Sequence, residues 1–465
     1  MTMPTMPTMP TVPTVLTVPS VPSVLFEHGT PDEPGAALAA FADYRRGAAT
    51  PGADGPDGTN AAPLRWYVDP GNLGLLSRAL GELPPRGIEA VLRADDVAED
   101  QTHVAHECAL VPTLRRLHTE RGLALVMSNG RPYLLPPPAL DISTNDLCGL
   151  ACNMCGNRAK QRDPHTMSPD QVRALIAEAA AWGIRRVALT GAGEPFRDKQ
   201  MPGHIRYANE LGHLVTITSN GFPISEPLAE ELAGRVVSIS ISIHGASDDT
   251  HERITGVAKA GDNAWRAIRR MVRARDARPG SKLSVNVSTV IQRANFAEIP
   301  ALVRRARDEG VDGINIQPVN LQHGAFRDGQ IIRRDDLALM ATLWPARDHH
   351  AALDAMFDEL DALKHEVGKV MHASPERLAL MRRYFHDSSR EALGVACRVG
   401  EAFLAVDHRG EIKPCYRLPW SHGDARITSV RALWNSRAYA RTRAHVDACP
   451  LTCMNNCFFR KKVPS

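Results

Sequence analysis

Residues 139–319 alternate between short apolar runs and longer amphipathic stretches, and this alternation restricts the fold more than any other feature of the chain. The apolar runs have the length of single β-strands, and the stretches between them are long enough for connecting helices. Strands joined by helices pair in parallel, so the sequence predicts an α/β domain on a parallel sheet. The periodicity leaves open a sheet that closes partway into a barrel and an open, doubly wound sheet. Strands are expected at residues 139–144, 185–191, 214–220, 236–243, 282–291 and 313–319.

Signals at the ends of the connecting segments support helices between these strands. One segment begins with Ser168 as N-cap and Pro169 at the first helical position, and Gln171 completes the pattern of a capping box. A later segment ends at Gly310, a residue type that often terminates helices. Residues 326–393 are mostly polar and amphipathic and predict a helical connector to the C-terminal part of the chain.

The N-terminal sequence is a short-period repeat, MTMPTMPTMPTVPTV, with proline at almost every third or fourth position. Proline that dense cannot hold a helix, and the segment lacks the basic start and unbroken apolar core of a signal peptide. We therefore expect residues 1–62 to be disordered and the protein to be cytoplasmic. Residues 63–138 predict a small α/β module that runs helix first and ends, at 123–135, in a hairpin around Asn129-Gly130.

Charge and hydrophobicity narrow the classes of partner. The formal net charge is +3 and the arginines are spread along the chain, so no nucleic acid partner is expected. No apolar run approaches the roughly 20 residues that span a bilayer, so no membrane partner is expected either. Without a secretion signal the nine cysteines do not predict a disulfide framework, and their clustering indicates metal or redox chemistry instead.

Three cysteines, Cys148, Cys152 and Cys155, follow the first predicted strand with the spacing C-x3-C-x2-C. Thiolates bind zinc and iron–sulfur clusters. A structural zinc site needs four protein ligands, so this triad would have to take a distant fourth. A 4Fe–4S cluster on three thiolates instead leaves one iron open to a substrate or cofactor. Ligand sites in parallel β-α folds lie beyond the carboxyl ends of the strands, which is where the triad falls.

Glycines and small polar residues follow three further strands at the same edge of the predicted sheet. A Gly-Ala-Gly-Glu-Pro turn comes after the second strand, and its glycines allow close approach of the backbone to a ligand. Each motif alone is more typical of an ordinary turn or strand end, and their register at successive strand ends is what suggests a site. The positions are Gly191, Gly193, Glu194, Ser219, Asn220, Ser240 and Ser242.

The cysteine triad, the glycine turn and the sequence SIHGASDDTHERITG at the fourth strand together resemble the radical SAM superfamily. The resemblance covers residues 139–319 and implies a partial (β/α)6 TIM-like barrel over residues 139–325. It implies a 4Fe–4S cluster on Cys148, Cys152 and Cys155, whose open iron chelates S-adenosylmethionine. Reductive cleavage would give methionine and a 5′-deoxyadenosyl radical, with electrons from a flavodoxin- or ferredoxin-type reductant.

The resemblance also implies roles for the strand-end residues. Gly193 and Glu194 would hold the amino group of S-adenosylmethionine. Asn220, with Ser240 or Ser242, would lie near its ribose and carboxylate. The expected cofactor-binding set is Gly191, Gly193, Glu194, Ser219, Asn220, Ser240, Ser242, Arg253 and Met154.

Three positions depart from the superfamily's usual pattern. Met154 precedes the third cysteine, where an aromatic residue is common, and its thioether could still pack against adenine. Ala192 replaces the second glycine of the turn. His244 stands where many relatives have aspartate, whereas Arg253 matches an arginine that recurs in this loop.

A second cysteine set lies in residues 394–465, where Cys397 and Cys415 flank Gly410 as C-x12-G-x4-C. Glycine at that position supports a hairpin that returns the chain to the same metal. The segment resembles the SPASM or twitch domains that follow some radical SAM barrels, and five cysteines suffice for one auxiliary 4Fe–4S cluster with four ligands. A zinc ribbon is the alternative. The auxiliary ligands are expected to be four of Cys397, Cys415, Cys449, Cys453 and Cys457.

Five thiols for four ligands leave one over, and Cys449, Cys453 or Cys457 could then donate a hydrogen atom to a substrate radical. Cys108 is a further spare for which no chemistry is expected. A donor thiol favours epimerisation, here at a carbinol carbon of a sugar or aminocyclitol in antibiotic biosynthesis. The alternatives are a dehydrogenase on the same substrates, a maturase of a ribosomally made peptide, and a non-catalytic zinc or iron–sulfur scaffold. Because peptide-modifying relatives often begin with a three-stranded sheet, the helix-first order of residues 63–138 argues against a peptide.

Overall fold

The computed structural model describes residues 64–67, 88–92, 114, 117, 124–127 and 135–461, with gaps at 157–161, 328–329, 398, 419–420, 448 and 455–458. The chain divides into two compact units, Met1–Tyr133 and Leu134–Ser465. The segment expected to be disordered, residues 1–62, lies outside the described residues. No helix in the described part of the chain is long and apolar enough to cross a membrane.

The N-terminal unit contains a three-stranded parallel sheet in the order β1-β2-β3, with bounds Leu64–Tyr67, Ile88–Leu92 and Ala124–Met127. The helix-first order expected from the sequence is wrong, because β1 opens the module. Of the expected hairpin at 123–135, the first strand is present as β3 and pairs in parallel with β2. The second strand of that hairpin falls largely outside the described residues.

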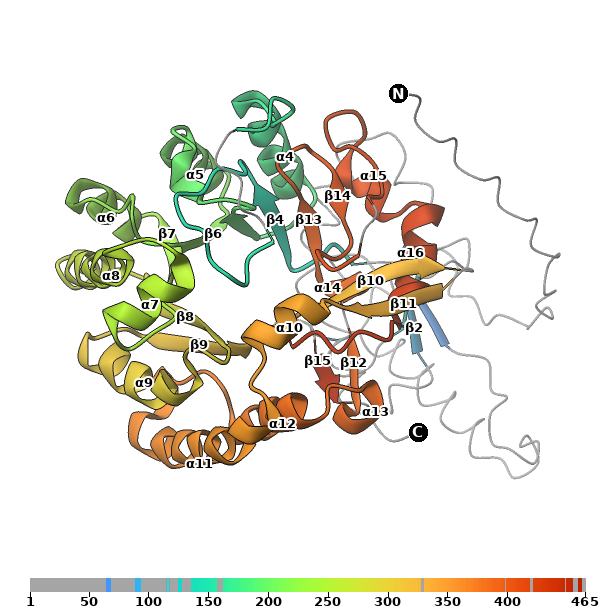
Figure 1. Ribbon diagram of the computed structural model, residues 1–465. Helices are drawn as coiled ribbons and strands as arrows, with labels where there is room; N and C mark the ends of the chain where they lie inside the picture. Colours follow the sequence, from blue (N-terminus) through green and yellow to red (C-terminus); the bar gives the residue numbers. More distant parts are fainter. Residues whose placement is uncertain are drawn as a thin grey trace, which may run out of the picture. The chain divides into compact units, whose positions relative to one another are not determined.

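Six parallel strands form the centre of the second unit, and all six expected strands are confirmed to within two residues at each end. The strands curve around a common interior, and their helices cover only the outer side of the sheet (Figure 1). This arrangement is a partial barrel and excludes the open, doubly wound sheet, which carries helices on both faces. The strands are β4 (Ala139–Ser143), β5 (Arg186–Thr190), β6 (Leu214–Ser219), β7 (Val236–Ser242), β8 (Ser284–Ile291) and β9 (Gly313–Pro318).

The helices outside the barrel bury one apolar face against the strands. In the first of them the Ser168 hydroxyl accepts from the Gln171 N–H, and the Gln171 side chain accepts from the Ser168 N–H, so the capping box is confirmed. Gly310, with φ of 76°, follows the last of them, as expected. The helices are α4 (Pro169–Ala181), α5 (Met201–Glu210), α6 (Glu226–Ala233), α7 (Asp248–Thr255), α8 (Ala260–Asp276) and α9 (Ile299–Asp308).

The connector after β9 begins with an antiparallel hairpin, β10 (Gln322–Arg327) and β11 (Gln330–Asp335), which the sequence analysis missed. Asp328-Gly329, a dipeptide that favours two-residue turns, was the available signal. The rest of the connector is helical, as expected. Its helices are α10 (Leu337–Leu343), α11 (His350–Val367), α12 (Pro375–His386) and α13 (Arg390–Leu393).

The C-terminal region joins the barrel through its sheet. Strand β13 (Leu404–Val406) pairs in parallel with β4, and β14 (Ile412–Lys413) pairs antiparallel with β13, so the barrel sheet has eight strands. Gly410, with φ of 83°, lies in the turn between β13 and β14 and returns the chain toward Cys415. The other elements are β12 (Val395–Cys397), α14 (Val399–Ala402), α15 (Val430–Trp434), α16 (Arg437–Asp447) and β15 (Phe459–Lys461).

Candidate active site

A cavity of about 450 Å³ opens among the residues at and beyond the carboxyl ends of the barrel strands. Most of the residues expected from the sequence line it, although they come from three strand ends and the cysteine loop. Parallel strands bring these ends to one edge of the sheet, which explains why distant motifs meet. The expected residues on its wall are Cys148, Cys152, Met154, Cys155, Gly191, Gly193, Glu194, Ser219, Asn220 and Ser242.

Two expected residues do not line the cavity. Ser240 is on the same face of β7 as Ser242 but two residues before the end of the strand, so it lies deeper in the barrel. Arg253 is exposed on α7, where its guanidinium donates to the Thr250 hydroxyl at 2.9 Å. The motif match at Arg253 therefore does not correspond to a position on the cavity wall.

The cysteine loop is fixed by backbone hydrogen bonds to the end of α7. Ala151 N–H donates to the carbonyl of Thr255 at 2.9 Å, and Asn153 N–H donates to that of Ile254 at 2.9 Å. The Cys148 sulfur accepts from Leu150 N–H at 3.4 Å and from the Asn220 amide at 3.9 Å. Burial raises the pKa of Cys148, and the nearby Glu194 and Cys155 raise it further. A thiolate at this position therefore requires a neighbouring positive charge, which a bound iron–sulfur cluster supplies.

The spacing of the sulfur atoms distinguishes a cluster from a single zinc ion. Zn–S bonds of about 2.3 Å in a tetrahedral site would place the sulfurs about 3.8 Å apart. Among the residues that the structure describes, the sole group of three His, Cys, Asp or Glu ligand atoms within 4.8 Å of one another is Asp146, Asp163 and His408. No three sulfurs of the described cysteines therefore lie within 4.8 Å of one another, a wider spacing than that of a tetrahedral zinc site.

The turn after β5 fits only glycine at two positions. A Cβ on Gly191 would lie 2.2 Å from the carbonyl oxygen of Gly193, and a Cβ on Gly193 would lie 2.1 Å from that of Leu147. Gly193 N–H donates to the Asn145 carbonyl at 3.2 Å, and Glu194 N–H donates to the Leu147 carbonyl at 2.6 Å. The turn is thus held against the residues that lead into Cys148.

Glu194 is buried, and its carboxylate accepts hydrogen bonds from the Ser219 hydroxyl and the Asn220 backbone N–H, both at 2.7 Å. Burial raises its pKa from 4.5 to about 7, although these hydrogen bonds oppose the shift. Bringing the ammonium group of a ligand to this carboxylate would favour its ionised form.

Replacing Glu194 with glutamine is expected to flatten the pH dependence of stability between about pH 4.5 and 7. Because folding raises this pKa, the protonated group stabilises the fold fully below pH 4.5, and that contribution is lost as pH rises through about 7. The free energy of unfolding of the wild type should fall, relative to Glu194→Gln, by up to about 3 kcal/mol over this window. Denaturant unfolding of both proteins without S-adenosylmethionine measures the difference, and parallel pH curves would contradict the assignment.

His244, which replaces the aspartate common in relatives, lines the cavity as a neutral side chain. Its pKa is lowered to about 3, mainly by burial and in smaller part by the adjacent His251. The two rings stack with their centroids 5.7 Å apart. His251 Nδ1 accepts from the His244 backbone N–H at 2.8 Å, so His251 stays neutral on that nitrogen and holds the end of β7 in place.

Four cysteines of the second set gather in one apolar pocket with Leu418. The pKa of Cys415 is raised to about 12, mainly by burial, and the nearby Cys453, Cys397 and Cys449 contribute to the rise. Four ionised thiols cannot coexist there without a cation, so the donor set fits a four-ligand cluster. The fifth cysteine, Cys457, and the spare Cys108 lie outside the described residues.

The cavity wall also includes Asn320 and Arg417, which the sequence analysis did not single out. Both lie beside Cys453, where the Asn320 side chain and the charge of Arg417 oppose the rise in the pKa of that thiol caused by burial. Thr190, also on the wall, donates to the carboxylate of Asp141 at 2.5 Å, and the Tyr416 hydroxyl donates to the same oxygen at 3.3 Å. The cavity therefore reaches from the first cysteine set to the neighbours of the second.

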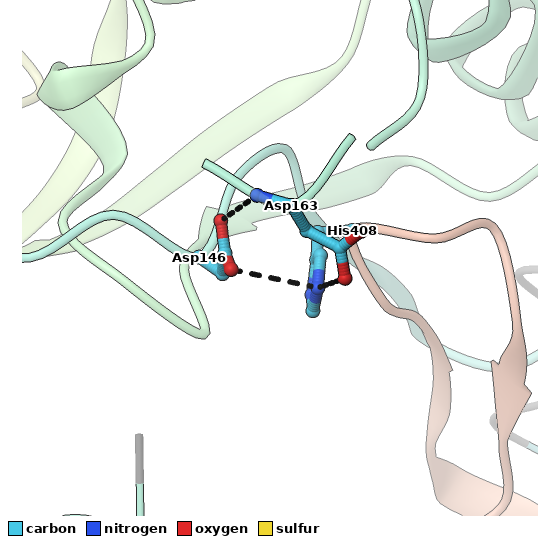
Figure 2. Close-up of side chains that lie close together, drawn as sticks. All are labelled: Asp146, Asp163 and His408. Carbon is cyan, nitrogen blue, oxygen red and sulfur yellow. Dashed lines mark hydrogen bonds and ion pairs between the residues drawn. The ribbon is translucent and has the colours of Figure 1, made fainter. Parts of the chain in front are cut away.

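Asp146, Asp163 and His408 connect the cysteine loop region to the β13–β14 turn (Figure 2). His408 Nε2 lies 3.5 Å from Asp163 and 4.0 Å from Asp146. The guanidinium of Arg409 donates to Asp163 at 2.6 Å, and hydrogen bonds from His165 and Arg409 lower the pKa of that carboxyl to about 2. The arginine takes the place next to Asp163 that a cation would need, so this cluster joins two segments of the chain.

Family models match both parts of this arrangement. Residues 142–306 match the radical SAM superfamily, and residues 397–458 match SPASM, described as an iron-sulfur cluster-binding domain. The chain therefore contains a radical SAM domain followed by a C-terminal SPASM domain, as the resemblance in the sequence implied. Its cofactors are S-adenosylmethionine with a 4Fe–4S cluster in the first domain and auxiliary iron–sulfur binding in the second, and the non-catalytic scaffold is set aside.

Several known proteins are similar to this chain. The "PqqA peptide cyclase" of Xanthomonas oryzae is 23% identical over 318 residues, which cover 66% of this chain and 77% of the relative. A "Probable GTP 3',8-cyclase" of Saccharolobus islandicus is 27% identical over 202 residues, 43% of this chain and 63% of the relative. The crystal structure of Streptococcus suis SuiB bound to S-adenosylmethionine superposes with a TM-score of 0.50 at 16% identity, covering 80% of this chain and 77% of SuiB, which shows a shared fold.

Proposed function

We propose that this protein modifies a peptide by radical chemistry, removing two hydrogen atoms to form a new bond within it. The observation that carries the proposal is the cavity, whose wall holds Cys148, Cys152 and Cys155 and also the residues beside Cys453. When bound, the cofactors supply a 5′-deoxyadenosyl radical that takes one hydrogen atom, and an acceptor for the electron that the substrate radical then gives up. A substrate in this cavity would lie between the first cysteine set and the residues beside Cys453.

Residues of the chain can accept the proton that the substrate releases when its radical loses an electron. Asp141 faces the barrel interior, and burial raises its pKa to about 6, so its carboxylate is ionised but basic near neutral pH. It is reached from the cavity wall through the Thr190 hydroxyl. The proton released when the substrate radical loses its electron can pass along this route to Asp141.

The similarity to PqqA peptide cyclases supports a peptide substrate over the sugar or aminocyclitol that the sequence first suggested. That relative aligns with 66% of this chain and is named for a peptide substrate, whereas neither of the other two similar proteins reported above is named for a sugar epimerase. The main argument against a peptide was the helix-first order of the N-terminal module. That argument no longer holds, because the module opens with β1 and contains a three-stranded sheet.

The test uses reconstituted protein with S-adenosylmethionine and a flavodoxin-type reductant. The candidate substrates are the short peptides encoded beside its gene and, separately, a panel of sugars and aminocyclitols. We expect a peptide to stimulate 5′-deoxyadenosine formation and to lose the mass of two hydrogen atoms. A peptide or sugar that instead keeps its mass in water and gains one deuterium in D2O would show epimerisation and contradict the proposal.

A further inference from the structure

Among the described residues of the cavity wall, Arg417 is the one that carries a positive charge at neutral pH. The other basic side chain there, His244, is neutral because burial lowers its pKa to about 3. The other described wall residues are the carboxylate of Glu194, which Ser219 and Asn220 already engage, cysteines, glycines, apolar side chains, and the hydroxyl and amide groups of residues such as Thr190 and Gln317. Positive charge in this cavity is therefore concentrated at one position.

The backbone of Arg417 is fixed on both sides. Its N–H donates to the Cys415 sulfur at 3.3 Å, and its carbonyl accepts from Gly324 of β10 at 2.9 Å. A Cβ on Gly324 would lie 2.6 Å from the Leu418 side chain, so the hairpin packs tightly at this point. The guanidinium is thus presented to the cavity from a backbone that the SPASM domain and the β10–β11 hairpin hold together.

The Arg417 side chain makes no hydrogen bond or ion pair with the residues that the structure describes, although it is partly buried. Arg333, which also lies near Cys453, is fully engaged by contrast: it pairs with Asp335 at 2.8 Å and donates to Ser388. A guanidinium facing a cavity without a carboxylate partner costs solvation, and a bound anion would restore its hydrogen bonds.

The carboxylates of the chain near the cavity are already engaged elsewhere. Glu194 accepts from Ser219 and Asn220, and Asp141 accepts from Thr190 and Tyr416. Neither of these carboxylates pairs with Arg417, so an anionic ligand in the cavity can supply its partner.

We propose that Arg417 anchors a carboxylate of the substrate, which makes an acidic side chain or a C-terminus of the peptide a determinant of recognition. The proposal rests on the peptide-modifying function proposed above. Arginine presents a planar fork that binds carboxylates through two parallel hydrogen bonds. Its place beside Cys453 puts the anchored group on the part of the wall next to the SPASM domain.

Binding to the reconstituted protein with S-adenosylmethionine tests this anchor. The probes are acetyl-Gly-Glu-Gly-amide, its glutamine counterpart and glutarate, each measured by isothermal titration. The wild type should bind the glutamate peptide about 10- to 100-fold more tightly than the glutamine peptide. Arg417→Gln should lose this preference, and Arg417→Lys should keep only part of it because it retains the charge without the fork. Arg266→Gln, which removes an exposed pair with Asp262 on α8, is the matched control and should behave as the wild type.

The outcomes separate this proposal from the proposed function. If glutarate binds in an Arg417-dependent way but neither peptide binds, the anion site stands and the peptide function fails. An equal affinity for the two peptides and no glutarate binding in the wild type, or a preference retained in Arg417→Gln, overturns the anchor. Loss of iron or of substrate-free S-adenosylmethionine cleavage in Arg417→Gln also overturns it, because the guanidinium would then serve a cofactor.

Discussion

Cys148→Ala is expected to abolish formation of 5′-deoxyadenosine, whereas Cys415→Ala should retain part of it. The first substitution leaves two protein thiolates for a cluster that binds S-adenosylmethionine through its open iron, so cofactor and cleavage are lost together. The second removes a ligand from the buried SPASM set and leaves the cavity residues around Cys148 unchanged. Anaerobic reconstitution followed by chromatography of the nucleoside product under dithionite measures both effects.

Iron and sulfide analysis provides the control for this pair. Each variant should lose about four irons relative to the wild type, because each loses one 4Fe–4S cluster. The cleavage that Cys415→Ala retains should be uncoupled, yielding 5′-deoxyadenosine without substrate oxidation. Equal cleavage by the two variants, or cleavage abolished only in Cys415→Ala, would show that the roles of the two cysteine sets are assigned wrongly.

The barrel could be predicted because its signals are local. Runs such as residues 236–243 combine strand length with flanking turn residues, and Ser168 with Gln171 marks a helix start within four positions. The pairing of β13 with β4 could not be predicted in the same way. It joins Leu404 to Leu140, two residues that the whole barrel separates in the sequence. Strands as short as β13, with three residues, and β14, with two, carry no pattern that specifies which edge of the sheet they extend.

The same difference between local sequence signals and long-range contacts decides which site residues could be predicted. Short motifs of a few residues indicated the cysteines, Gly193 and Glu194 as site residues. Arg417 was missed because an arginine two positions after a cysteine has no pattern of its own. Its role depends on a cavity that residues near 148, 194, 244 and 320 complete. Arg253 shows the reverse case, since it matches a motif and yet faces solvent on α7.

Gly193→Ala is expected to eliminate most binding of S-adenosylmethionine. The new methyl group would lie 2.1 Å from the Leu147 carbonyl oxygen and 2.5 Å from the Asp146 carbonyl carbon. These are backbone atoms that lead directly into Cys148, so relief of the clash must displace either the glycine turn or the start of the cysteine loop. Affinity should fall at least tenfold, and overpacking should lower the free energy of unfolding by about 1–3 kcal/mol.

Gly149→Ala is the matched control, because a Cβ at Gly149 meets no atom within 4 Å although the residue lies in the same loop, next to Cys148. Titration of S-adenosylmethionine into both reconstituted variants, with iron content measured in parallel, separates loss of the cofactor site from loss of the cluster. If the two variants bind equally well, the contact between the turn and the loop is not what shapes the site. If only Gly193→Ala loses affinity while its iron is retained, the close approach of Gly193 to Leu147 positions the cofactor, and no larger residue can serve there.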